Sequence, residues 1–278
     1  MSGLKNCPHT GQPLIVSEFC DSFLYSEKTG VYYYKNARSL SYDDNYFSEE
    51  YKAQYGKTYI EDEKHLRHLA GIRLKRIKKY LNPHAFIFEI GCAAGFFLDE
   101  AKKRGYKTGG MEISAFASQH ARELFNLNVI CHSFADHPSG IIKRYITHPI
   151  DAIASFFTIE HFSDQKAVFQ NISQLLKSGG ILSLALPSIG GPLFRRNRKL
   201  WIDTHPEDHF ADYSPDSLKK VLNLYGFRVL KIYPASYHPE RIHPFLCRFP
   251  FSSAYKIYAD LAKYGDTMEV LAVKTQDF

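Results

Sequence analysis

"FIFEIGCAAGFFLDEAKKRGYKTGGMEIS", residues 86–114, decides the fold of this chain. Residues 86–90 form a short apolar run suited to a strand that is buried on both faces. Small residues follow at 91–95, then a helical pattern, a second short strand over 107–111 and finally the acid Glu112. A strand, a tight turn, a helix and another strand in this order predict a parallel α/β unit.

The alternation of strands and helices continues through the rest of the chain. Helical patterns run over 61–81, 96–104 and 164–176, and two further helices begin after Ser114 and Ser214. Strands are predicted over 86–90, 107–111, 128–131, 150–156, 181–186, 227–233 and 269–274. The pattern predicts an α/β fold with a doubly wound, mostly parallel, seven-stranded sheet.

The first 60 residues differ from the remainder. They are crowded with tyrosine and carry no sustained helical or alternating pattern until their end. We therefore expect residues 1–60 to be an irregular Tyr-rich appendage that acts as a lid, and residues 61–278 to form the α/β domain. Segments 187–213 and 234–265 lie between core elements and are predicted insertions.

Bulk properties are those of a globular protein. The chain has 278 residues, of which 45% are hydrophobic and 23% charged, and its net charge of +6 permits an acidic partner without requiring one. Five scattered cysteines indicate reduced thiols. There is neither an apolar run of membrane-spanning length nor a signal peptide pattern, so we expect a cytoplasmic protein without a membrane span. The oligomeric state is left open.

The turn at 91–95 lies where open α/β sheets bind ligands, at the carboxyl end of the first core strand. Its small residues permit close approach of a ligand, and Glu112, 21 residues after Gly91, suits a carboxylate that grips ribose hydroxyls. These features predict an adenosine-containing ligand. The third glycine of a dinucleotide motif is missing, and Glu89 can receive a ligand ammonium group. S-adenosylmethionine has such a group and a nicotinamide dinucleotide does not.

Four motifs in order carry a resemblance to a known family: EIGCAAGFFL, GMEIS, IDAIASFFTIEHFSD and LLKSGGILSLALP. The chain resembles the Rossmann-like, or class I, S-adenosylmethionine-dependent methyltransferases, and is most similar to the group of ubiquinone-pathway O-methyltransferases. The match covers residues 85–186 and extends to the helix and strands that close the sheet. Ala93 departs from the pattern, because the family usually has glycine there.

The resemblance implies a set of cofactor contacts. The methionine part would lie on Glu89 and the loop, Glu112 would hold the ribose, and Ile113 would pack on the adenine. Phe156 and Phe157, at the end of a strand, would lie near the sulfonium, although core packing is the alternative for both. The implied cofactor-binding residues are Glu89, Gly91, Cys92, Ala93, Gly95, Glu112, Ile113, Ser133, Phe134, Ala135, Asp136, Phe156 and Phe157.

Methyl transfer from a sulfonium is an in-line displacement, so a base is needed only when the acceptor atom carries a proton. His161 and His209 are the candidate catalytic bases. A metal on His205 and His209 is the alternative, but Pro206 interrupts the usual motif order and the sequence offers no evident third ligand. We therefore expect no metal.

Acceptor identity is the open question. The basic cluster Arg195, Arg196, Arg198 and Lys199 either holds an anion or forms a solvated face. We expect transfer to a small-molecule acceptor, with oxygen as the acceptor atom and S-adenosylhomocysteine as product. The alternatives are a tRNA or other RNA methyltransferase, for which no recognised RNA module is seen, a non-catalytic nucleotide-binding protein of the same fold, and a dinucleotide oxidoreductase.

Overall fold

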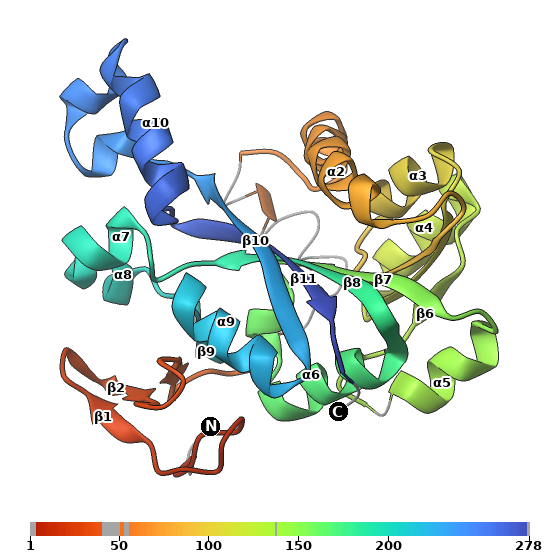
Figure 1. Cartoon of the computed structure of the whole chain (residues 1–278), viewed down its shortest axis with the longest axis horizontal. Coiled ribbons are helices and arrows are strands. Elements are labelled where there is room, and N and C mark those ends of the chain that lie inside the picture. Colours follow the sequence, from red (N-terminus) through yellow and green to blue (C-terminus); the bar gives the residue numbers. More distant parts are fainter. Residues whose placement is uncertain (1–3, 41–50, 53–55, 137, 277–278) are drawn as a thin grey trace. The chain divides into compact units, whose positions relative to one another are not determined.

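A computed structural model describes residues 4–40, 51–52, 56–136 and 138–276 (Figure 1). Seven strands form one sheet in the order β10-β11-β8-β7-β4-β5-β6, which confirms the predicted seven-stranded sheet. The strands are β4 (Phe86–Ile90), β5 (Lys107–Glu112), β6 (Val129–Cys131), β7 (Ile150–Phe156), β8 (Leu176–Pro187), β10 (Phe227–Ser236) and β11 (Thr267–Lys274).

The register of the parallel strands sets the position of the turn at residues 91–95. β4 pairs in parallel with both β5 and β7, so that Ile90 lies opposite Met111 on one side and opposite Ser155 on the other. Every residue of β4 is buried. The turn after β4, the end of β5 and the end of β7 therefore emerge at the same edge of the sheet, as predicted for a ligand site.

Helices follow the strands with the caps that the sequence predicts. Ser114 caps α4 by accepting a hydrogen bond from the Ala117 N–H, and Ser214 with Ser217 forms a capping box on α9. α5, α7, α8 and α10 were not predicted. The helices are α2 (Glu63–Ile77), η2 (Lys78–Tyr80), α3 (Phe96–Lys103), α4 (Ala115–Phe125), α5 (Pro138–Tyr145), η3 (Ile159–His161), α6 (Gln165–Leu175), α7 (Pro192–Arg196), α8 (Arg198–Asp203), α9 (Pro215–Leu224), η4 (Pro239–Arg241), η5 (Pro244–Cys247) and α10 (Phe251–Ala262).

The N-terminal segment is not irregular, which corrects the expectation from sequence. It forms β1 (Ile15–Ser17), β2 (Cys20–Tyr25) and β3 (Tyr32–Tyr34), coloured red in Figure 1. With β9 (Ala211–Asp212) they make a second, four-stranded sheet in which neighbouring strands are antiparallel. Strands this short show too little alternation to be recognised, and the partner of β3 comes from a distant part of the chain.

The chain divides into two compact units. One comprises residues 1–39, 157–169 and 184–272, and the other comprises residues 40–156, 170–183 and 273–278. The turn after β4 belongs to the second unit, and His161 and His209 belong to the first. In neither unit does a described helix have the length and apolar character needed to cross a membrane.

Candidate functional site

The turn between β4 and α3 depends on left-handed backbone at three positions. Gly91, Ala93 and Gly95 have φ of 68°, 46° and 86°. A Cβ at Gly95 would lie 2.8 Å from both the Ala121 Cβ and a Leu127 methyl carbon, so only glycine fits there. Ala93 takes up the same conformation with a side chain, which is unfavourable for L-residues. The turn is therefore held in shape by its surroundings.

Glu112 joins the turn to the end of β5. One carboxylate oxygen accepts the Ala93 N–H at 2.8 Å, and the other accepts the Ser114 N–H at 2.9 Å. Burial raises the pKa of Glu112, while these backbone hydrogen bonds act in the opposite direction. The next side chain, Ile113, is 54% exposed and forms an apolar surface beside the carboxylate. A fixed carboxylate next to an exposed apolar side chain suits a ribose and its base.

Glu89, at the end of β4, is 4% exposed. Burial raises its pKa well above the ordinary value; the charge of Arg73 lowers it and that of Glu112 raises it further. Arg73 comes from α2, which lies beside α3 (Figure 1), and its guanidinium carbon is 4.0 Å from the centre of the Phe156 ring. A carboxyl group and a guanidinium thus lie within electrostatic range of each other at this edge of the sheet. Together they suit a zwitterionic ligand, which has one ammonium and one carboxylate group.

Sequence reasoning missed Arg73. It is buried on the same stripe of α2 as Ala70, Leu74 and Ile77. An arginine at an apolar position of a helix is the signal that could have found it, because arginine is rarely buried in a protein interior.

Two predicted cofactor residues can contribute only their backbone. The Cys92 side chain is buried against β5, where its sulfur is 2.9 Å from the position of a Cβ on Gly110. Phe134 is 3% exposed. In the same loop after β6, Ala135 and Asp136 are exposed, and the Ser133 hydroxyl accepts the Ala135 N–H at 3.2 Å. This loop is the predicted adenine segment.

The two phenylalanines that end β7 have different environments. Phe156 is half-buried and packs edge-on against Phe97, with 5.0 Å between ring centres. Phe157 is 44% exposed and has a φ of 54°. Core packing, the alternative for Phe157, is therefore wrong. A bulky side chain in a left-handed backbone is an uncommon and strained arrangement.

The two candidate bases lie together in the first unit. The ring centres of His161, on η3, and His209 are 4.8 Å apart. The His161 Nδ1 is 2.9 Å from a carboxylate oxygen of Asp208. Burial lowers the pKa of His161, but Asp208 and Glu160 outweigh this effect and raise it overall. Burial and the neighbouring His161 lower the pKa of His209 to about 3.

Glu160 completes this cluster. It is 2% exposed, and burial raises its pKa to about 7. The Phe210 N–H donates a hydrogen bond of 2.8 Å to the Glu160 carbonyl, which ties η3 to the segment that carries Asp208 and His209. The arrangement offers a histidine oriented by a carboxylate, which is a common acid–base device.

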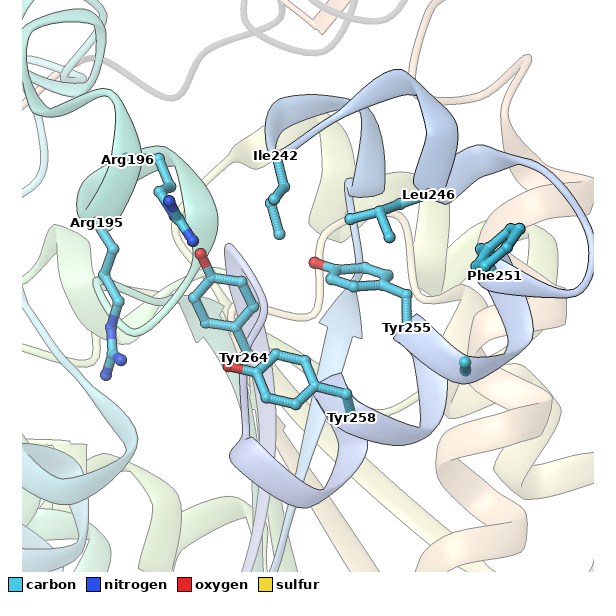
Figure 2. A pocket seen from close by; sticks show the side chains of 9 residues that line it. Arg195, Arg196, Ile242, Leu246, Phe251, Tyr255, Tyr258 and Tyr264 are labelled. Carbon is cyan, nitrogen blue, oxygen red and sulfur yellow. The ribbon is translucent and has the colours of Figure 1, made fainter.

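The basic cluster of the sequence separates into two pairs. Arg198 packs over the rings of Phe19 and Phe194, and Lys199 forms an ion pair with Asp203. Arg195 and Arg196 instead line a cavity of about 590 Å³ in the first unit (Figure 2). In Figure 2 the side chains of Arg196 and Tyr264 point toward each other. The other lining residues are Ile242, Leu246, Phe251, Ala254, Tyr255 and Tyr258.

The sheet order, the glycine turn and the acid after β5 define a Rossmann-like nucleotide-binding enzyme fold. Residues 63–232 match the family model described as a methyltransferase domain. The chain belongs to this family and is an S-adenosylmethionine-dependent methyltransferase of class I, as the motifs predicted. No curated protein gives a significant match.

Solved structures with this fold are distant in sequence. A chain in the complex between the Haloferax volcanii Trm112 methyltransferase activator and a methyltransferase is 14% identical, with a TM-score of 0.56 over 82% of this chain and 97% of that one. An S-adenosylmethionine-dependent methyltransferase from Archaeoglobus fulgidus is 18% identical, with a TM-score of 0.54 over 78% and 99%. Magnesium protoporphyrin IX methyltransferase from Synechocystis is 12% identical, with a TM-score of 0.55 over 83% and 97%.

Proposed function

We propose that this enzyme transfers a methyl group from S-adenosylmethionine to oxygen on a small-molecule acceptor and releases S-adenosylhomocysteine. The observation that carries the cofactor part is the Glu112 carboxylate, which is fixed by two backbone N–H groups at the turn after β4. Its remaining lone pairs accept the two ribose hydroxyls.

The other cofactor contacts follow from the same edge of the sheet. Glu89 takes the ammonium group and Arg73 takes the carboxylate of the methionine part, since one is a buried acid and the other a buried guanidinium. The backbone of residues 91–95 follows the methionine chain, Ile113 packs on the adenine, and residues 133–136 line its edge. The rings of Phe156 and Phe157 stabilise the sulfonium, each by about 1 kcal/mol.

For a hydroxyl acceptor, we assign the base to His161. Asp208 holds its Nδ1, so Nε2 takes the acceptor proton as the C–O bond forms and the C–S bond breaks. Loss of the methyl group would leave the cofactor as a neutral sulfide, and His161 would then pass the proton to water. His209, the other candidate, lies against His161 and positions it.

The cavity in the first unit supports a small acceptor with an anionic group. Its volume of about 590 Å³ is in the range of small-molecule sites. Arg195 and Arg196 supply positive charge, and the tyrosines supply apolar walls with polar tips. Because Arg198 and Lys199 are engaged elsewhere, the observations favour a compact anion over an extended nucleic-acid backbone.

The cofactor assignment is tested by calorimetric titration with S-adenosylhomocysteine. We expect micromolar binding that Gly91→Arg abolishes and that Glu112→Ala weakens about 100-fold, because two hydrogen bonds to a charged group are lost. Glu123→Gln, an exposed position on α4, is the matched control. Absence of binding to the folded wild-type chain, or binding of a nicotinamide dinucleotide instead, would contradict the assignment.

The acceptor assignment is tested with labelled S-adenosylmethionine and a panel of phenols and alcohols that carry or lack a carboxylate or phosphate. We expect transfer to anionic members, with a KM that Arg196→Ala raises about 10-fold while affinity for S-adenosylhomocysteine is unchanged. Transfer to RNA alone supports the RNA alternative, and cofactor binding without transfer to any acceptor supports a non-catalytic protein.

A further inference from the structure

Three side chains of ligand type meet within the first unit. Glu160 and His161 come from η3, and His209 comes from the segment before β9. One potential ligand atom from each residue lies within 4.8 Å of the other two. The hydrogen bond from Phe210 N–H to the Glu160 carbonyl fixes the two segments beside each other.

Glu160 supplies an independent sign that this cluster holds a cation. Its side chain is 2% exposed, and neither carboxylate oxygen has a hydrogen-bond partner among the described residues. A carboxylate that is removed from water without compensation is costly, and native structures pair such a group with a donor or a metal.

His161 has the orientation of a metal ligand. Its Nδ1 lies 2.9 Å from Asp208, which leaves Nε2 to act as the ligand atom. A carboxylate on the other nitrogen of a ligating histidine is the usual arrangement in metal sites, because it fixes the ring and makes it more basic.

We propose that Glu160, His161 and His209 form a site for a divalent transition metal ion, with Asp208 as its supporting carboxylate. Two imidazoles and one carboxylate suit Zn²⁺, Co²⁺ or Fe²⁺ and leave positions open for water or an oxygen ligand. Ligand atoms about 2 Å from one ion lie at most about 4 Å apart, so binding draws these atoms together by no more than about 1 Å.

The site differs from the metal alternative raised by the sequence. The sequence offered no evident third ligand for His205 and His209, but in the structure Asp212 joins them, with one potential ligand atom from each residue within 4.8 Å of the other two and a contact of 3.0 Å to His205 Nε2. The Glu160 cluster is preferred because both carboxylate oxygens of Glu160 have no hydrogen-bond partner among the described residues, whereas the Asp212 carboxylate is already paired with His205. The ion takes the same Nε2 that is proposed above as the base, so His161 acts as a base only in the metal-free chain, and the Co²⁺ titration tests the site without reference to the acceptor.

The test is a titration of the full, metal-stripped chain with Co²⁺, followed by its visible absorption, and with Zn²⁺ in competition. We expect saturation at one Co²⁺ per chain and displacement by Zn²⁺. Asp208→Asn is expected to weaken Co²⁺ affinity about 10- to 100-fold, and Glu160→Gln and His209→Asn by more than that. Glu207→Gln, in the same segment but with a side chain 59% exposed, should bind as the wild type does.

Retained binding of S-adenosylhomocysteine and an unchanged circular dichroism spectrum show that a variant is folded. If Glu160→Gln does not fold, His209→Asn carries the test. The site is overturned if the wild-type chain binds no Co²⁺, or if Glu160→Gln and His209→Asn bind it as the wild type does. Binding that is lost only in His205→Asn would assign the ion to the other histidine cluster and would equally reject the proposal.

Discussion

Ala93 shows how far one residue can depart from a motif. At this position the backbone is left-handed, with a φ of 46°, which explains why glycine is usual in the resembling family. Alanine takes up this conformation at a cost of roughly 1 to 2 kcal/mol. The Ala93 N–H hydrogen bond to Glu112 holds the strained residue in place.

Substitutions at Ala93 should therefore show how far the affinity for S-adenosylhomocysteine depends on the backbone conformation of the turn. We expect Ala93→Gly to bind S-adenosylhomocysteine as tightly as the wild type, because relief of strain offsets the added flexibility of glycine. Ala93→Val should bind S-adenosylhomocysteine at least about 10-fold more weakly than the wild type, since a β-branched side chain fits this backbone poorly. Calorimetry and urea unfolding measure both effects. Wild-type affinity in Ala93→Val would show that the turn is not strained.

At the scale of the element, α2 does more than cover the sheet. The buried stripe of α2 includes Arg73, which lies over the Phe156 ring. A second arginine of α2, Arg67, ties the helix to α3. Arg67 forms ion pairs with Asp99 and Glu100 at 2.6 Å and 3.0 Å. A helix fixed to α3 in this way holds Arg73 in position at the cofactor edge.

Removal of the Arg73 charge should affect only ligands that have a carboxylate. We expect Arg73→Met to weaken binding of S-adenosylhomocysteine about 10- to 100-fold, the value of a charge-assisted hydrogen bond, while adenosine binds as before. Arg73→Lys should recover part of the loss, and Lys75→Met on the exposed face of α2 is the control. Equal losses for both ligands would show that Arg73 only packs against Phe156.

At the scale of the molecule, the parallel sheet and the cofactor loop could be predicted because their signals are local. The turn at 91–95, the acid at 112 and the cap at Ser114 each occupy a few consecutive residues, and the structure has them as expected. Local patterns also predicted the seven core strands, although β8 begins at Leu176, before the expected residue 181.

What could not be predicted depends on contacts between distant segments. β3 pairs with β9, His161 meets Asp208, and Arg73 reaches Phe156, and in each case the sequence of one partner does not indicate which residue the other is. The helices at 192–203 and 251–262 are short or lie in the variable insertions, where no alternation of strands and helices constrains them. Single-sequence patterns do not encode these pairings.

The N-terminal segment should make the stability of the molecule sensitive to acid. His9 is hydrogen-bonded to the Tyr225 hydroxyl at 3.0 Å and lies 3.3 Å from that of Tyr213. Burial lowers the pKa of His9 to about 4, although the charge of Asp164 acts in the opposite direction. The unfolded chain, with an ordinary histidine pKa of about 6.5, then binds more protons than the folded chain between those two values.

The free energy of unfolding should therefore fall as the pH drops from about 6.5 to about 4, by up to roughly 3 kcal/mol from His9 alone. Above pH 6.5 this residue contributes no pH dependence, because it is neutral in both states. His9→Gln keeps a hydrogen-bonding side chain that does not titrate, so its urea unfolding curves should lose less stability across the same window. The exposed His148→Gln should behave as the wild type does. Equal acid sensitivity in His9→Gln and the wild type would mean that His9 can be protonated in the folded chain. The contacts of Tyr213 and Tyr225 would then not exclude a charge from this position.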